Sequence, residues 1–145
     1  MKNKFTIVLI YIIFFFNFNL LSEENDKNLK IGLVAPLSGA YSELGSSLIY
    51  SLQLALDEIG DKKVFIVPRD SGFNNKEKLD AAIQDIKSQG IKIIIGPITF
   101  KEFEVAKNYS DIVFISPSNI NPEFTNNIIS VGVSLESQLE ALLSF

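Results

Sequence analysis

The chain has 145 residues, of which 47% are hydrophobic and 21% are charged, and it contains no His, Cys or Trp. That length suits one compact domain rather than two. Without His or Cys the sequence excludes a Ser-His-Asp triad, a thiol nucleophile, a disulfide and the usual zinc and haem sites. A formal net charge of −4 also argues against a nucleic-acid partner, because phosphate binding needs a basic face.

The N-terminus has the pattern of a secretory signal. Lys2 and Lys4 precede an apolar run that begins at Phe5, and Ser22 stands directly before an acidic stretch. We therefore expect residues 1–22 to be a signal peptide or a retained membrane anchor. The apolar run reaches only the lower end of the roughly 17–25 residues that span a bilayer, which favours cleavage and export to a periplasm. If it is retained, this segment is the expected membrane contact of the chain.

Short apolar runs alternate with amphipathic stretches of helix length in the rest of the chain. The pattern predicts strands over residues 30–35, 64–67, 91–95, 112–115 and 128–133. It predicts helices over residues 44–59, 75–89 and 101–109, and a last helix that Ser134 caps. Because strands and helices alternate through short links, we expect an α/β fold with a doubly wound parallel sheet.

The last helical pattern stops at Phe145 without a Gly, a Pro or a polar tail. A helix that ends there exposes carbonyl groups and apolar side chains. We therefore expect the chain to be the N-terminal part of a longer protein.

Three loops are candidates for ligand binding, because ligands of open α/β sheets lie beyond the carboxyl ends of the strands. They are residues 36–42, 96–100 and 116–120, which are rich in small, hydroxyl and amide side chains. We expect each to expose backbone N–H groups near a following helix, and helix N-termini attract anions such as a carboxylate. In the first loop Ser38 and Tyr41 are the candidates, and Tyr41 suits stacking on a ligand as well as a structural role.

Catalytic patterns are missing from the same loops. The sequence has no Gly-rich dinucleotide turn and no phosphate-binding loop, so it predicts no catalytic residue, no metal site and no cofactor. Asp70 stands at the end of the second predicted strand. We expect it to make a turn or capping hydrogen bond, with Arg69 as one partner.

Several segments, in order and spacing, carry a family resemblance. They are I-G-L-V-A-P-L-S-G-A-Y at 31–41, L-G at 44–45, Q-L-A-L-D-E-I at 53–59, I-I-G-P at 94–97 and F-I-S-P-S-N at 114–119. As a set they resemble the opening of the type I periplasmic binding proteins, the leucine-binding-protein-like receptors. The resemblance covers about residues 29–145.

The resemblance implies a two-lobed clamshell that closes on a small solute, with residues 29–145 forming part of the first lobe. In this family, groups after the third and fourth strands hold the carboxylate and amine of the ligand. Matched by position, these are Thr99 and Phe100, then Ser118 and Ile120, with Asn119 in the same loop. Phe100 and Ile120 stand where amino-acid receptors tend to have Ser or Thr. The implied function is non-catalytic capture of an amino-acid-like solute for the permease of an ABC transporter.

A second branch of the fold is also similar. The direct link 60–63 and the segments 68–72 and 132–138 look like the penicillin-binding protein activators, which regulate peptidoglycan synthases. The better-known members of that branch are lipoproteins, and this chain has no Cys to which a lipid could be attached. The sequence therefore leaves two alternative partners, an ABC permease and a peptidoglycan synthase.

Overall fold

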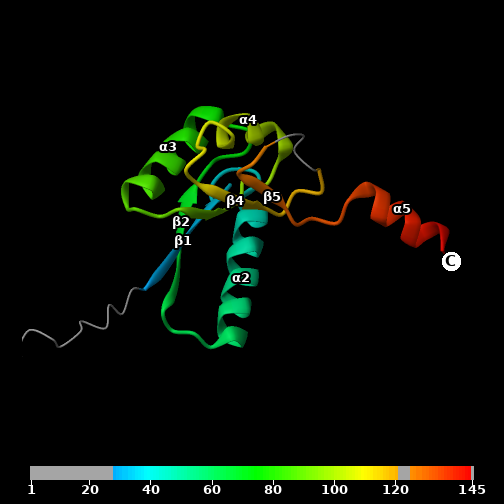
Figure 1. The fold of residues 1–145 in the computed structure, drawn as a ribbon, viewed down its shortest axis with the longest axis horizontal. Helices are drawn as coiled ribbons and strands as arrows, with labels where there is room; N and C mark the ends of the chain where they lie inside the picture. The colour runs from blue at the N-terminus through cyan, green and yellow to red at the C-terminus, as the bar shows by residue number, and fades with distance from the viewer. Residues whose placement is uncertain (1–27, 121–124, 145) are drawn as a thin grey trace, which may run out of the picture.

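A computed structural model describes residues 28–120 and 125–144 of the chain. In these residues a single parallel sheet is formed, with the strand order β2-β1-β3-β4-β5 (Figure 1). The strands are β1 (Leu29–Ala35), β2 (Val64–Asp70), β3 (Ile93–Ile95), β4 (Val113–Ser116) and β5 (Ile128–Ser130). The predicted α/β fold with a parallel sheet is confirmed.

Helices link these strands in alternation up to β4. They are α2 (Ser42–Ile59), α3 (Lys76–Ser88), the short 3₁₀ helix η2 (Phe100–Glu102) with α4 (Phe103–Ala106), and α5 (Leu135–Leu143). Figure 1 shows α3 and α4 on one face of the sheet and α2 on the other. This division follows from right-handed crossovers, because the chain moves from β1 to β2 in one direction and from β2 to β3 in the other.

The core lies between the sheet and α3. Val34, Ile94 and Phe114 project from three neighbouring strands toward this helix, and all three are fully buried. The helix contributes Leu79, Ala82, Ile83 and Ile86, whose spacing of three or four residues forms one apolar face. Burial of this face fixes α3 on the sheet, and with it the loops at both ends of the helix.

Strand β2 is longer than the apolar pattern predicts, because it continues through Pro68 to Asp70. Among the described residues it is an edge strand that pairs with β1 alone, and a proline is tolerated where its nitrogen faces an open edge. Ser71 N donates to Ala35 O at 2.9 Å, so the nitrogen of Pro68, three residues earlier, points away from β1. The extension brings Asp70 level with the end of β1.

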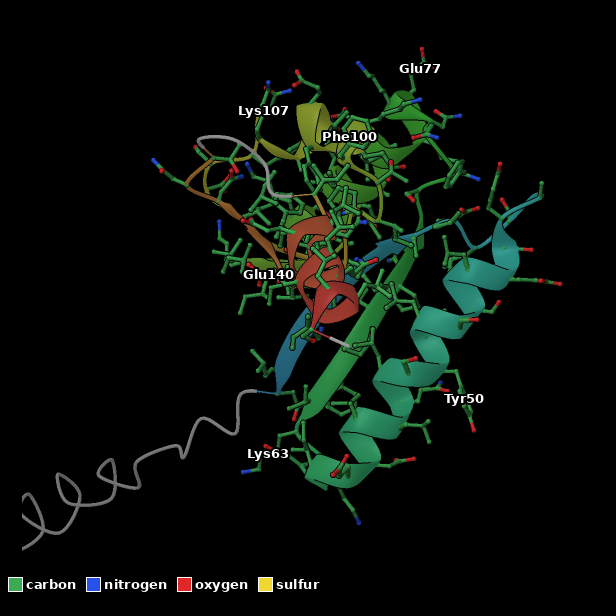
Figure 2. The ribbon with its side chains drawn as sticks, turned by 90° about the vertical axis from the view of Figure 1, so that its right-hand side faces the viewer. Tyr50, Lys63, Glu77, Phe100, Lys107 and Glu140 are labelled. Atoms are coloured by element: carbon green, nitrogen blue, oxygen red, sulfur yellow. The ribbon has the colours of Figure 1, made fainter. Side chains whose placement is uncertain are left out.

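Helix α2 lies along β1 and β2, and Figure 2 shows Tyr50 pointing away from the sheet. Its first turn contacts the loop after β1 closely. A Cβ atom at Gly45 would lie 2.2 Å from Pro36 O, so only glycine fits this position. The close contact sets where the loop between β1 and α2 runs.

The ends of the chain add two observations. Ser134 Oγ accepts a hydrogen bond from Ser137 N at 3.1 Å, which confirms the predicted cap of α5. Helix α5 buries no residue against the described part of the chain and projects away from the sheet (Figure 1). The predicted signal or anchor, residues 1–22, lies outside the described residues, and none of the described helices is long and apolar enough to cross a bilayer.

Candidate functional site

The three predicted loops lie at one edge of the sheet. Because the strands are parallel, the segments that follow β1, β3 and β4 all emerge at the carboxyl edge. Ser38 and Tyr41 follow β1 and Thr99 and Phe100 follow β3, whereas the β4 loop contributes a third group of candidates, Ser118, Asn119 and Ile120. The strand order reverses between β1 and β3, and such a switch point is where open α/β sheets bind ligands.

Backbone contact at the switch point is close. Gly96, directly after β3, has a φ of 108°, and a Cβ atom there would lie 2.4 Å from Val34 O of β1. Both observations require glycine. The loops after β1 and β3 therefore leave the sheet side by side.

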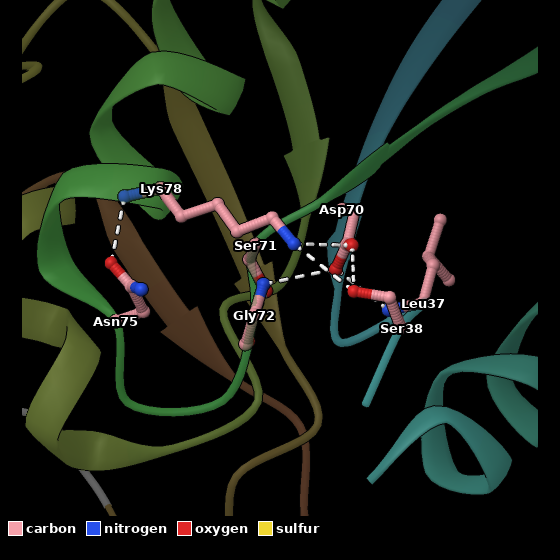
Figure 3. A network of polar contacts seen from close by, with 7 residues as sticks. All are labelled: Leu37, Ser38, Asp70, Ser71, Gly72, Asn75 and Lys78. Atoms are coloured by element: carbon pink, nitrogen blue, oxygen red, sulfur yellow. Dashed lines mark hydrogen bonds and ion pairs between the residues drawn. The ribbon is translucent and has the colours of Figure 1, made fainter. Parts of the chain in front are cut away.

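Asp70 connects the β1 loop to the β2 loop (Figure 3). Its Oδ1 accepts hydrogen bonds from Leu37 N at 2.9 Å and from Gly72 N at 3.0 Å. Its Oδ2 accepts from Ser38 Oγ at 2.5 Å and from Lys78 Nζ at 2.6 Å. The predicted turn bond is thus present, to Gly72 N. The predicted pairing with Arg69 is wrong, because Arg69 Nε donates to Asp85 on α3 instead.

The chemistry of this cluster favours positioning over catalysis. Burial alone would raise the pKa of Asp70, but the hydrogen bonds from Lys78, Ser38, Gly72 and Leu37 together hold it well below its usual value. A carboxylate with so low a pKa is a poor base for removing a serine proton. The Ser38 hydroxyl consequently has no activating partner in this cluster, although Lys78 Nζ also lies 3.1 Å from its oxygen.

An aromatic stack provides a second link between the same two loops. The rings of Tyr41 and Phe73 lie with their centroids 3.8 Å apart and their planes 17° from parallel. Contacts between aromatic rings add to the free energy gained from burial. Tyr41 nevertheless remains half-exposed, so one side of its ring faces solvent.

Glu102 connects the β2 loop to the β3 loop. It is almost fully buried, and its two carboxylate oxygens accept hydrogen bonds from Asn74 N and Thr99 N, each at 3.2 Å. Thr99 Oγ1 adds a bond to Asn74 Oδ1 at 2.9 Å. Burial raises the pKa of Glu102, although the N–H groups of Thr99 and Asn74 oppose that shift.

Serine hydroxyls extend the network to β4 and β5. Ser116 Oγ donates to Pro97 O at 2.5 Å and accepts from Ser118 N at 3.1 Å. Ser130 Oγ of β5 donates to Ser118 O, and Ser118 Oγ accepts from Ile120 N at 3.2 Å. Consecutive loops of the carboxyl edge are thus joined by polar contacts from β2 to β5.

The exposed groups at this edge are largely apolar. Tyr41, Phe100 and Ile120 are 50%, 49% and 44% exposed, so their side chains are available to an apolar ligand body. Among the described residues no group of acidic side chains is placed to hold a metal ion. The edge can therefore offer apolar surface, hydroxyl groups and backbone amides to a small molecule.

Sequence reasoning missed the residues that link the β1, β2 and β3 loops, namely Phe73, Asn74, Lys78 and Glu102. For Glu102 a signal was present, because Thr99 and Glu102 have the T-x-x-E spacing of a capping box, and the structure contains that box. The other three act through contacts between distant loops.

Two hollows lie away from these loops. One, of about 390 Å³, is at the amino edge beside Leu29 and Ile91, and one of about 230 Å³ lies between α2 and β2.

Comparisons with known proteins point to one family. The family described as "Periplasmic binding protein" matches residues 28–145. A Leu/Ile/Val-binding protein of Rhizobium johnstonii is 29% identical over 110 residues, which cover 68% of this chain and 29% of that protein.

Solved structures show the same fold. The leucine-binding protein LivK of Thermotoga maritima superposes with a TM-score of 0.66 at 20% identity, covering 81% of this chain and 36% of that protein. The substrate-binding protein LivJ of Streptococcus pneumoniae, solved with isoleucine, has a TM-score of 0.61 at 21% identity, with 72% and 33% covered. A solute-binding protein from R. palustris, solved with 4-hydroxybenzoate, has a TM-score of 0.57 at 21% identity, with 62% and 27% covered. This chain spans about a third of the length of such relatives.

Proposed function

The chain belongs to the periplasmic binding protein family, and on that premise we propose that it forms part of the first lobe of an exported receptor for a small solute. The observation that carries this proposal is the convergence of the β1, β3 and β4 loops at the switch point of the sheet. In this proposal residues 29–145 are the first-lobe segment, residues 1–22 direct export to the periplasm, and an ABC permease receives the solute. The lobe binds the solute without chemical change.

The proposed ligand is a small carboxylic acid with an apolar body. Tyr41, Phe100 and Ile120 supply the apolar surface. The polar contacts fall to hydroxyl and backbone groups of Ser38, Thr99, Ser118 and Asn119, because hydroxyl and backbone N–H groups supply the hydrogen-bond donors and acceptors that such a ligand needs. The ligands named for two related structures, isoleucine and 4-hydroxybenzoate, share a carboxylate and an apolar body.

Isothermal titration calorimetry of the full-length protein tests this function. L-Isoleucine, L-leucine, benzoate and 4-hydroxybenzoate are the probes, and we expect at least one to give a saturable isotherm. Asn119→Ala, in the β4 loop, should weaken binding of that probe. Asn108→Ala, beyond the far end of α4, is the matched exposed control and should leave it unchanged. Absence of heat and of a thermal shift with every probe would contradict the proposal.

The second candidate is regulation of a peptidoglycan synthase by a penicillin-binding protein activator. One observation favours it: α2 ends at Ile59 and β2 begins at Val64, so the link between them is the short one on which the resemblance to that branch rests. This function predicts direct binding of the full-length protein to a purified penicillin-binding protein. Solute binding without such an interaction would leave solute capture as the supported function.

A further inference from the structure

We propose that Lys78 and Asp70 form a positioning pair that fixes the loop between β1 and α2 in its ligand-binding conformation and orients the hydroxyl of Ser38. The consequence for binding rests on the proposed function, whereas the fixing of the loop does not. The pair joins residues from three places in the chain, namely the start of α3, the end of β2 and the β1 loop (Figure 3).

Lys78 is held at both ends. Its main-chain N donates to Asn75 Oδ1 at 3.0 Å, the N-cap bond of α3, so the first turn of the helix is fixed. Its ammonium group donates to Asp70 Oδ2 at 2.6 Å and to Ser38 Oγ at 3.1 Å. Because the core anchors α3, the Lys78 side chain starts from a fixed point, and its ammonium group contacts both Asp70 and Ser38.

Asp70 connects Lys78 to the β1 loop through hydrogen bonds. Its other oxygen accepts from Leu37 N, so backbone and side chain of the loop are bound by the same carboxylate. Hydrogen bonds to an ionised carboxylate are about twice as strong as neutral ones. Loss of Lys78 removes the cation and one of the four donors to Asp70, which should weaken the bonds from Leu37 and Ser38 to the same carboxylate.

The pair also determines what Ser38 can bind. A hydroxyl has one proton to donate and two lone pairs to accept with. The Ser38 proton points to Asp70 and one lone pair accepts from Lys78, so these bonds leave one lone pair. A ligand group at Ser38 must therefore be a donor, such as an ammonium or a hydroxyl, and not a carboxylate oxygen. The ligand's carboxylate then falls to the β3 and β4 loops.

Amide hydrogen exchange of the full-length protein tests the positioning role without any ligand. Lys78→Met keeps the aliphatic stem and removes the charge, and it should raise the exchange rate of the Leu37 amide about tenfold. Lys87→Met is the matched control: Lys87 also lies on α3, is equally exposed and pairs with Asp111 at 2.9 Å, remote from the β1 loop. Lys78→Arg, which restores the cation, should return exchange to the wild-type rate.

Unchanged exchange in Lys78→Met relative to wild type and Lys87→Met would overturn the proposal. If Lys78→Met lowers the melting temperature more than Lys87→Met does, Asp70→Asn gives the second measurement, and it must also accelerate Leu37 exchange. With a probe that binds wild type, Lys78→Met should weaken affinity about tenfold while Lys78→Arg does not. Equal affinity in wild type and Lys78→Met would overturn the role in binding. If no probe binds wild type, the proposed function fails, and the exchange result still decides the positioning role.

Discussion

Two carboxylates organise the candidate site, because each accepts hydrogen bonds from backbone N–H groups of two neighbouring loops. Asp70 serves the β1 and β2 loops, and Glu102 serves the β2 and β3 loops. The environments of the two carboxylates shift their pKa values in opposite directions. Hydrogen bonds lower the pKa of Asp70, whereas burial raises the pKa of Glu102. Beyond the strand ends, backbone N–H groups have lost their hydrogen-bond partners in the sheet. The two carboxylates accept hydrogen bonds from these groups instead.

The Asp70 carboxylate should make the stability of the fold depend on pH. Its folded-state pKa lies below the unfolded value of 3.8, so its contribution is complete above that value and is lost as pH falls through the lower pKa. Asp70→Asn should cost about 1–3 kcal/mol at pH 7. The difference in unfolding free energy between wild type and variant should then shrink as the pH is lowered below 4.

Denaturant unfolding of the full-length protein at several pH values measures this difference. Asp57→Asn, at the exposed end of α2, is the control and should differ little from wild type across the range. A difference between wild type and Asp70→Asn that stays constant from neutral to acid pH would show that Asp70 is not stabilised as an anion.

At the scale of elements, most of the fold was predictable because each strand and helix carries its own apolar pattern. The pattern of α3 predicts its buried face directly, and Ser134 predicts the cap of α5. The errors occur where tertiary context decides. Pro68 continues an edge strand, and residues 131–133 lie outside β5 although their composition is apolar. The strand propensity of a residue does not indicate on which side its strand has a hydrogen-bonded neighbour.

The contact between α2 and the β1 loop gives a prediction at this scale. Gly45→Ala places a Cβ atom 2.2 Å from Pro36 O, a clash with backbone that no rotamer relieves. We expect a loss of about 3 kcal/mol in unfolding free energy. Gly60→Ala, at the αL cap of α2 where nothing lies within 4 Å, should cost about 1 kcal/mol for its positive φ alone.

Chemical denaturation of both variants checks the comparison. Equal losses in Gly45→Ala and Gly60→Ala would mean that α2 does not depend on close contact with the β1 loop.

For the molecule as a whole, topology places the candidate residues and side-chain contacts connect them. The predicted order of elements already puts Ser38, Thr99 and Ser118 at the carboxyl edge, because the strands are parallel. The partners of Asp70 could not be predicted, since Ser38 and Lys78 reach it from 32 residues before and eight after in the chain. Pairing of this kind depends on where α3 sits on the sheet, and the local sequence does not specify that position.

The sheet itself is covered unevenly in the described residues. Helices α3 and α4 cover one face, whereas on the other face α2 lies over β1 and β2 and leaves Val113 and Ile129 exposed. Helix α5 likewise keeps its leucines exposed. The chain spans about a third of the length of the relatives that it matches.

The most direct test of the central claim is a crystal structure of the full-length protein with the solute that calorimetry identifies. We expect the solute at the carboxyl edge, with a donor group at Ser38 Oγ and its carboxylate on the loops that contain Thr99 and Ser118. A solute bound in the amino-edge hollow beside Leu29 and Ile91, with the carboxyl edge vacant, would contradict the account.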